Sequence, residues 1–300
     1  MPPLDTGALA FRALRRLPIH ALSRAAGRVA SWHLPTALRA PACRVFATAF
    51  GADLDEVRDP LDSFRSVQEF FTRALRDGAR PIDPAPDALV APCDGAWGAA
   101  GTIVDGQLLQ VKGRPYSLAA LLGDDATARA FEGGAFATLY LAPRDYHRFH
   151  APCDARVSRS VYLPGALWPV NRIGLDHVDD LFAENERIVA FLQPGREPAS
   201  GAPDALAIAA VGATLVGKVH VDFDTLTTQG RAKAPVWRHY DRAPLLAKGH
   251  EWGRFEFGST LVLAAAPGVL ELDTRAPGTP LRLGTRIGRL IGKGEESISE

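Results

Sequence analysis

Cysteine is scarce in this 300-residue chain, and the three cysteines, Cys43, Cys93 and Cys153, lie far apart. Three scattered thiols cannot form a disulfide framework, and no Cys-x-x-Cys pair is present to suggest a zinc site. We therefore expect reduced thiols in a cytoplasmic protein.

Long apolar runs are also missing. The longest run without a charged residue covers residues 257–270 and is broken by Pro267, whereas a membrane-spanning helix needs about 18 or more apolar residues. The first residues, Met1 to Asp5, lack the basic patch and apolar core of a secretory signal. We expect the protein to remain on the cytoplasmic side, in solution or on a membrane surface.

Acidic residues are absent from residues 6–52, although the whole chain has a formal net charge of zero. The arginines of this segment are Arg12, Arg15, Arg16, Arg24, Arg28, Arg39 and Arg44. A basic, acid-free opening can indicate nucleic acid binding, a transit peptide or an anionic membrane surface.

Apolar residues recur at helical spacing in the same segment, from Leu9 to Leu17 and again from Leu22 to Leu34. Apolar anchors beside arginines are typical of a helix that lies on an anionic membrane. A helix packed on its own domain gives the same pattern. Because the segment has no acids at all, we favour membrane binding for residues 8–50.

The pattern along the whole chain predicts an α+β protein, with helices in its N-terminal part and strands after them. Ser66-Val67-Gln68-Glu69 is a capping box that begins a helix with Phe70, Phe71 and Leu75 on one face, ending near Asp77. From about residue 88, short apolar runs between glycine and proline turns predict strands at 108–111, 136–141, 219–223 and 260–264. Residues 157–163 alternate poorly, and residues 284–292 predict a glycine-kinked strand pair.

Three local clusters could carry chemistry. Asp94 lies in a tight turn before Gly95, which alone is a common hairpin feature. His147 and His150 follow an apolar run and have arginines beside them, which favours an anionic substrate and a lowered histidine pKa. As metal ligands the two histidines would need Cys153 or Asp154 in addition, and no known zinc spacing results. We therefore expect acid–base groups and no metal.

The third cluster is the Gly258-Ser259 pair, which lies between apolar stretches that should be buried strands. Glycine allows a backbone bond to be held in a strained conformation, and the serine hydroxyl can attack the preceding carbonyl. Together with Asp94 and His150, Ser259 could form an Asp–His–Ser arrangement in which a base activates a weak nucleophile. No Gly-x-Ser-x-Gly motif indicates an α/β-hydrolase.

These clusters and several longer runs resemble those of the proteobacterial-type phosphatidylserine decarboxylases. The similar runs include FRSVQEFFTRALR at 64–76, YLAPRDYHRFH at 140–150, LFAENER at 181–187 and FGST at 257–260, with shorter ones at 81–83, 94–95, 112–118, 162–165, 211–214 and 248–255. The family's cleavage motif is usually Leu-Gly-Ser-Thr, and Phe257 keeps an apolar side chain at its first position. The resemblance covers nearly the whole chain.

The resemblance implies that Asp94, His150 and Ser259 form a self-cleavage triad. His150 deprotonates Ser259, whose oxygen attacks the Gly258 carbonyl to give an ester. Elimination then separates residues 1–258 from 259–300, and the dehydroalanine at 259 hydrolyses to a pyruvoyl cofactor with loss of ammonia. Phosphatidylserine forms a Schiff base with this group and loses CO2, leaving phosphatidylethanolamine, and His147 assists decarboxylation or protonates the carbanion.

The resemblance also implies an organisation for the whole protein. Residues 1–62 form a basic helical region that binds the membrane, and residues 63–300 form a β-rich, barrel-like catalytic domain. The expected partners are phosphatidylserine, an anionic membrane surface, the protein's own cleaved chain and a second copy in a homodimer, with no nucleic acid. The expected location is the cytoplasmic face of the inner membrane.

Two classes of alternative remain. In a Ser–His–Asp hydrolase, Ser259 would act as an uncut nucleophile in a single 300-residue chain. A non-enzymatic carrier domain would need a modifiable lysine on a hairpin tip, and no such tip is present. A membrane-binding scaffold would keep the basic helices but would not need Asp94, His150 and Ser259.

Overall fold

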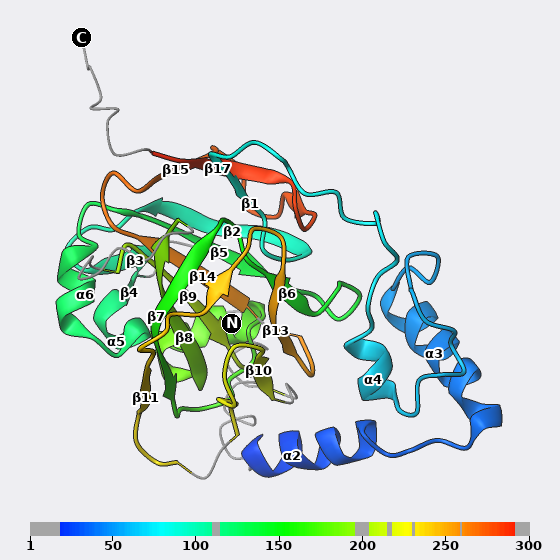
Figure 1. The fold of residues 1–300 in the computed structure, drawn as a ribbon. Coiled ribbons are helices and arrows are strands. Elements are labelled where there is room, and N and C mark those ends of the chain that lie inside the picture. The colour runs from blue at the N-terminus through cyan, green and yellow to red at the C-terminus, as the bar shows by residue number, and fades with distance from the viewer. Residues whose placement is uncertain are drawn as a thin grey trace, which may run out of the picture.

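The computed structural model describes residues 19–109, 115–195, 204–214, 218–229, 232–258 and 260–291. Three helices at the start lie beside a β-rich body (Figure 1). They are α2 (Ile19–Ala30), α3 (Thr36–Phe50) and α4 (Val67–Phe71). The predicted helix at Leu9–Leu17 lies outside the described residues, whereas the one predicted from Leu22 is confirmed by α2. None of the described helices is long and apolar enough to cross a bilayer.

Ser66 is the N-cap of α4 as predicted, but the Glu69 side chain accepts from the Arg65 N–H at 2.7 Å, one residue before the N-cap, and the helix is shorter than predicted. The Ser66 hydroxyl accepts a hydrogen bond from the Glu69 backbone N–H at 3.2 Å. The helix ends at Phe71 rather than near Asp77, because the chain turns away at Thr72 and Leu75 pairs with Val57 as a β-bridge. The predicted helical position of Leu75 is therefore wrong.

The main sheet is antiparallel and runs in the order β11-β7-β8-β9-β14-β5-β2-β16, with β12 also paired to β7. Its strands are β2 (Gly95–Thr102), β5 (Ala135–Tyr140), β7 (Ala155–Leu163), β8 (Arg187–Pro194), β9 (Leu206–Val211), β11 (Val236–His239), β12 (Leu245–Leu246), β14 (Thr260–Ala265) and β16 (Pro280–Leu281). Among the described residues no pairing joins β11 to β16, so this sheet is not a closed barrel.

Three smaller sheets complete the β structure. One has the order β10-β13-β6 and one the order β1-β17-β15, while β3 pairs with β4. Their strands are β1 (Ala88–Val90), β3 (Gln107–Leu109), β4 (Pro115–Ser117), β6 (Arg148–His150), β10 (Val219–Val221), β13 (Glu251–Phe255), β15 (Leu270–Leu272) and β17 (Arg286–Leu290). The strand pair predicted for residues 284–292 is wrong, since its described part is the single strand β17, which pairs with β1 and β15.

Both faces of the main sheet are buried. On one face Leu261 and Leu263 of β14 join a core that includes Phe149, Trp252 and Ile287 from the small sheets. On the other, Val262 joins a core shared with four short helices. Three of these, α5 (Leu118–Leu122), α6 (Asp125–Ala130) and α8 (Leu181–Glu184), contribute buried side chains, and α7 (Arg172–His177) packs Leu175 against it.

The α+β class with short helices before a β-rich region is confirmed. The proposed boundary between residues 62 and 63 stays a prediction. A third core cluster joins Cys43 and Phe46 of α3 to Phe64, Phe70 and Phe71, so side chains from both sides of that boundary pack together. All three cysteines are free thiols, as predicted, and all three are buried, which was not predicted.

Candidate active site

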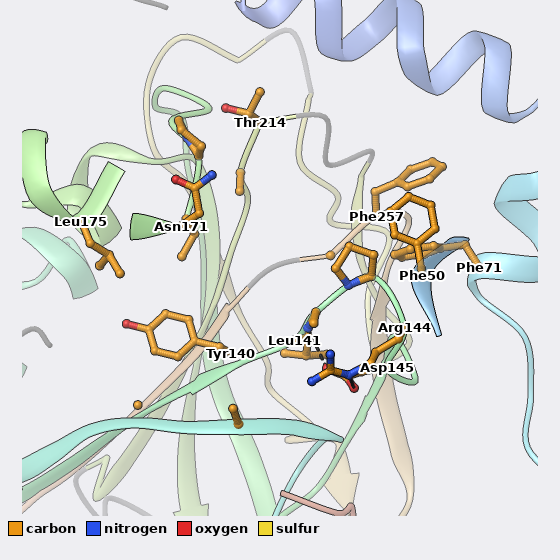
Figure 2. A pocket seen from close by; sticks show the side chains of 18 of the residues that line it. Phe50, Phe71, Tyr140, Leu141, Arg144, Asp145, Asn171, Leu175, Thr214 and Phe257 are labelled. Atoms are coloured by element: carbon orange, nitrogen blue, oxygen red, sulfur yellow. Dashed lines mark hydrogen bonds and ion pairs between the residues drawn. The ribbon is translucent and has the colours of Figure 1, made fainter. Parts of the chain in front are cut away.

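A cavity of about 960 Å³ lies between the N-terminal helices and one end of the main sheet. Its lining is largely apolar and comes from several segments: Ala26, Ala30, Phe46, Phe50, Phe71, residues 96–98, residues 140–145, Pro169, Val170, Asn171, Leu175, Ala213, Thr214, Phe257, Gly258, Pro277 and Gly278. Phe50, Phe71 and Phe257 gather on one side, and Leu175, Asn171 and Thr214 stand on the opposite side (Figure 2). The cavity can therefore hold a ligand with a large apolar part.

His147 lies behind the side of the cavity formed by Phe50, Phe71 and Phe257. It stands in the turn before β6 and is completely buried. Its Nδ1 lies 2.8 Å from the backbone oxygen of Asp145. Because a carbonyl oxygen can only accept a hydrogen bond, Nδ1 carries the proton, and Nε2 presents a lone pair. The Phe71 ring packs on the imidazole with centroids 3.9 Å apart. Burial, with a smaller contribution from the charge of Arg73, lowers the pKa of His147 to about 3.

Nε2 of His147 has no hydrogen-bond partner in the part of the chain that the structure describes, and it faces Gly258. A Cβ atom placed on Gly258 would lie 2.9 Å from this nitrogen and 3.2 Å from the Leu141 backbone oxygen. Only glycine fits here without displacing its neighbours. The structure therefore brings together two of the predicted residues, His147 and Gly258, at the edge of the cavity; Ser259 lies outside the described residues.

His150 lies on β6 with other partners. Its Nδ1 donates to the Gly249 oxygen at 2.8 Å, and its Nε2 accepts from the Tyr146 hydroxyl at 3.1 Å. Burial is the main cause that lowers the pKa of His150, and Arg148 lowers it further, as the flanking arginines led us to expect. For His147 the arginine that acts is Arg73 rather than a flanking one.

Asp94 precedes β2 and is held by Arg80. The Arg80 Nε lies 2.8 Å from one carboxylate oxygen of Asp94, and the Leu283 N–H donates to that same oxygen at 2.8 Å. Arg80 also binds Glu56 at 2.7 Å. Gly95 follows with φ of +148°, and a Cβ there would lie 2.0 Å from the Tyr140 oxygen. Glycine is thus needed for the turn that places Asp94.

None of the hydrogen bonds among the described residues joins Asp94 to His150. The charge of Asp94 nevertheless raises the pKa of His150, which partly offsets the effect of burial. Asp94 therefore acts on His150 through its charge and not through a hydrogen bond. No group of three or more histidine, cysteine or acidic side chains in the described segments could hold a metal ion.

Sequence reasoning missed Arg80 and Tyr146, which bond directly to Asp94 and His150, and Arg73, which shares the Asp145 backbone oxygen with His147. Arg73 and Tyr146 belong to runs that carried the family resemblance, at 64–76 and 140–150, so position within those runs was the available signal. Arg80 stands next to the short run at 81–83 and had no local signal of its own.

Comparison with known proteins points in one direction. Residues 67–289 match the family model described as phosphatidylserine decarboxylase. A phosphatidylserine decarboxylase proenzyme of Anaeromyxobacter sp. (strain K) is 46% identical over 283 residues, covering 93% of this chain and 98% of that protein. One from Pseudoalteromonas translucida (strain TAC 125) is 41% identical over 283 residues, covering 91% and 95%. One from Myxococcus xanthus (strain DK1622) is 37% identical over 279 residues, covering 93% and 97%.

Proposed function

The chain belongs to the phosphatidylserine decarboxylase family, and on that premise we propose that it cuts itself between Gly258 and Ser259 and then converts phosphatidylserine to phosphatidylethanolamine and CO2. The observation that carries this proposal is the unbonded Nε2 of His147 against Gly258. Buried polar atoms are almost always hydrogen-bonded, so an unbonded one beside the proposed cleavage site suggests a chemical role.

The surroundings of Gly258 fit a pyruvoyl group made from the next residue. The cavity that includes Gly258 is mostly apolar, and the only charged side chains among its described lining residues are Arg144 and Asp145. When present, a pyruvoyl group supplies an electrophilic carbonyl that accepts the electron pair released as CO2 leaves. An apolar wall excludes water and favours the loss of a carboxylate as neutral CO2.

Nε2 of His147 would carry the proton that the decarboxylated product takes up. The ring begins neutral because burial lowers its pKa to about 3, so Nε2 can accept a proton before it returns one to the product. The hydrogen bond from Nδ1 to Asp145 holds the ring while this exchange takes place. Stacking against Phe71 keeps the same orientation.

For self-cleavage we retain Asp94, His150 and Ser259. His150 is neutral, its Nδ1 proton is fixed by Gly249, and its Nε2 is an acceptor, as a general base requires. In this role Nε2 must exchange the Tyr146 hydroxyl for that of Ser259. The negative charge of Asp94 would stabilise the protonated His150 ring while, or after, the ion pair between Asp94 and Arg80 opens.

Membrane binding through residues 8–50 belongs to the same proposal. α2 and α3 expose apolar side chains and also form part of the cavity wall through Ala26, Ala30, Phe46 and Phe50. A phospholipid could then pass from a membrane surface into the cavity while its acyl chains remain in apolar surroundings. The homodimer and the cytoplasmic face of the inner membrane stay predictions of the family resemblance.

The intact mass of the purified protein tests the proposal. The wild type should give two chains, 1–258 and 259–300, whereas Ser259→Ala should give one species near 32.1 kDa. The wild type should also release CO2 from phosphatidylserine. A single 32.1 kDa wild-type species that reacts with serine-directed inhibitors would support the hydrolase instead.

The same measurement separates the two histidines. His150→Gln should remain uncut, and His147→Gln should be cut but should decarboxylate poorly. His239→Gln is a matched control, since His239 is exposed on β11. An uncut His147→Gln together with a cut His150→Gln would assign the self-cleavage base to His147.

A further inference from the structure

Arg73 is a buried cation that forms no ion pair with any of the described residues. It lies two residues after the end of α4 and is 3% exposed. Its Nη2 donates to the backbone oxygens of Arg144 and Asp145, at 3.0 and 3.5 Å. Its Nε and Nη1 are buried and have no hydrogen-bond partner, and no carboxylate among the described residues forms an ion pair with it. The guanidinium also lies 5.2 Å from the centroid of the Phe70 ring.

Arg73 and His147 donate hydrogen bonds to the same backbone oxygen. The backbone oxygen of Asp145 accepts from His147 Nδ1 at 2.8 Å and from Arg73 Nη2 at 3.5 Å. Phe71, two residues before Arg73, packs on the imidazole ring. One short stretch after Ser66 therefore supplies both the side chain that stacks on His147 and the cation that shares its carbonyl partner.

An arrangement of this kind lowers the stability of the folded protein. A buried charge whose donors are only partly satisfied is unfavourable, and replacing such a group by an apolar one of similar size is often neutral or stabilising. Residues that break the rules of stable packing are expected where function requires them.

We propose that Arg73 is a positioning residue for His147, which holds the Asp145 carbonyl in place and sets a positive charge behind the ring so that Nε2 remains an unprotonated acceptor toward Gly258. This inference rests on the proposed function, in which Nε2 of His147 moves the proton of decarboxylation. The charge of Arg73 contributes, after burial, to the lowered pKa of His147.

Arg73 does not act as a ligand for the substrate in this arrangement. The described residues that line the cavity include Phe71, Arg144 and Asp145 but not Arg73, and its unbonded nitrogens are buried. Its loss should therefore lower kcat and leave KM nearly unchanged. The other charges that act on it are Asp94, Asp145, Glu56 and Arg80; Arg80 pairs with both Glu56 and Asp94, and the Asp145 carboxylate accepts from the Ala142 N–H.

The test compares Arg73→Met with Arg73→Lys. Per mole of cut chain, Arg73→Met should lower kcat about tenfold or more while KM changes little, and Arg73→Lys should restore part of kcat because it restores the charge. In the uncut Ser259→Ala background, NMR titration of labelled histidine should show a higher His147 pKa after Arg73→Met. The His147 signal is assigned by its loss in His147→Gln.

Thermal unfolding in the same background gives an independent readout. Arg73→Met should leave the Tm nearly unchanged or raise it, since an unpaired buried charge is removed. Arg187 is the matched control, because this buried arginine donates to the backbone oxygens of Leu121, Ala183 and Asn185. In the Ser259→Ala background, Arg187→Met should lower the Tm. In the protein that retains Ser259, Arg187→Met should leave kcat per mole of cut chain unchanged.

A lower Tm for Arg73→Met with unchanged kcat and unchanged His147 pKa would overturn the inference and leave Arg73 a structural residue. A raised KM with unchanged kcat would make it a substrate ligand. If Arg73→Met is not cut, the His147 pKa in the Ser259→Ala background still decides. An uncut or inactive wild type would instead refute the proposed function itself.

Discussion

At the scale of single residues, His147 links the chemistry of the site to the stability of the fold. Burial and the charge of Arg73 lower its pKa from 6.5 to about 3. Between these two values the unfolded chain binds a proton at His147 that the folded chain does not bind. The free energy of unfolding therefore rises with pH across this window, and the stability is lost as pH falls below about 6.5.

We expect His147 to lower the free energy of unfolding by about 2 kcal/mol on going from about pH 7.5 to about pH 5. Urea unfolding of uncut Ser259→Ala protein at both pH values measures the total difference. The same pair of measurements on Ser259→Ala/His147→Gln should give a difference smaller by about that amount. An equal difference in the two proteins would mean that His147 is protonated or exposed in the folded chain.

The sequence directed attention to Asp94, His147 and His150, because the aspartate lies in a tight turn and the two histidines stand three residues apart with arginines beside them. It could not show what separates the two histidines. That difference depends on Phe71, which packs on His147, and on the Tyr146 hydroxyl, which binds His150 Nε2. Such contacts between distant or differently oriented side chains follow from the tertiary structure and leave no local pattern.

At the scale of elements, α2, α3 and the loop between them present an unusual surface. Six of the nine large apolar side chains that are exposed in the described residues lie between residues 22 and 50. They are Leu22, Val29, Trp32, Leu38, Val45 and Phe50. Arg24, Arg28 and Arg44 are exposed on the same two helices. Exposed apolar groups beside arginines are what binding to an anionic membrane surface requires.

Trp32→Glu/Val45→Glu should therefore weaken binding to vesicles made of equal parts phosphatidylglycerol and phosphatidylcholine. The two side chains are 75% and 70% exposed, so their replacement should leave the Tm nearly unchanged. Vesicle sedimentation measures the bound fraction. Val104→Glu is the control, since Val104 is 56% exposed but lies outside these helices. Equal binding by the wild type and the double variant would refute the membrane role of α2 and α3.

Two elements show where the periodicity of the sequence fails. The helix at Ser66 begins as predicted but ends at Phe71, since the Thr72 hydroxyl bonds back to the Gln68 oxygen at 3.2 Å and the next residues leave the helix. The poor alternation of residues 157–163 has a different cause. In β7, Val157 and Arg159 face the adjacent residues Leu192 and Phe191, so Ser158 forms a β-bulge that shifts the alternation by one position.

At the scale of the whole molecule, the segment after the proposed cleavage site is deeply embedded. β14 lies between β9 and β5, and all six of its residues are buried. β16 pairs with β2, and β17 pairs with β1, so three strands of the short chain are bound to strands of the long one. The proposed cut before Ser259 removes none of the residues that form these pairings.

We expect the 259–300 chain to remain bound after self-cleavage. The two chains should elute together in size-exclusion chromatography without denaturant and separate only after unfolding. Thermal unfolding of the cut protein should show one transition, because β14 contributes to the cores on both faces of the sheet. Recovery of a folded 1–258 chain free of the short one would contradict this expectation.

The α+β class and the positions of β3, β5, β10 and β14 could be predicted, since apolar runs and turn residues are local signals. The order of strands could not. β14 pairs with β5 and β9, which lie far earlier in the chain, and nothing within Thr260–Ala265 specifies these partners. The division of the β structure into one large and three small sheets has the same non-local origin.

The position of β14 also bears on when the protein can mature. β14 is an interior strand, although it stands near the end of the chain, and its two neighbours are synthesised long before it. In the proposed self-processing, the Gly258–Ser259 bond meets its catalytic surroundings only once β14 fills the gap between β9 and β5. Cleavage would then mark a chain whose main sheet is assembled around β14, and an uncut chain in the cell would identify a protein in which this step has not taken place.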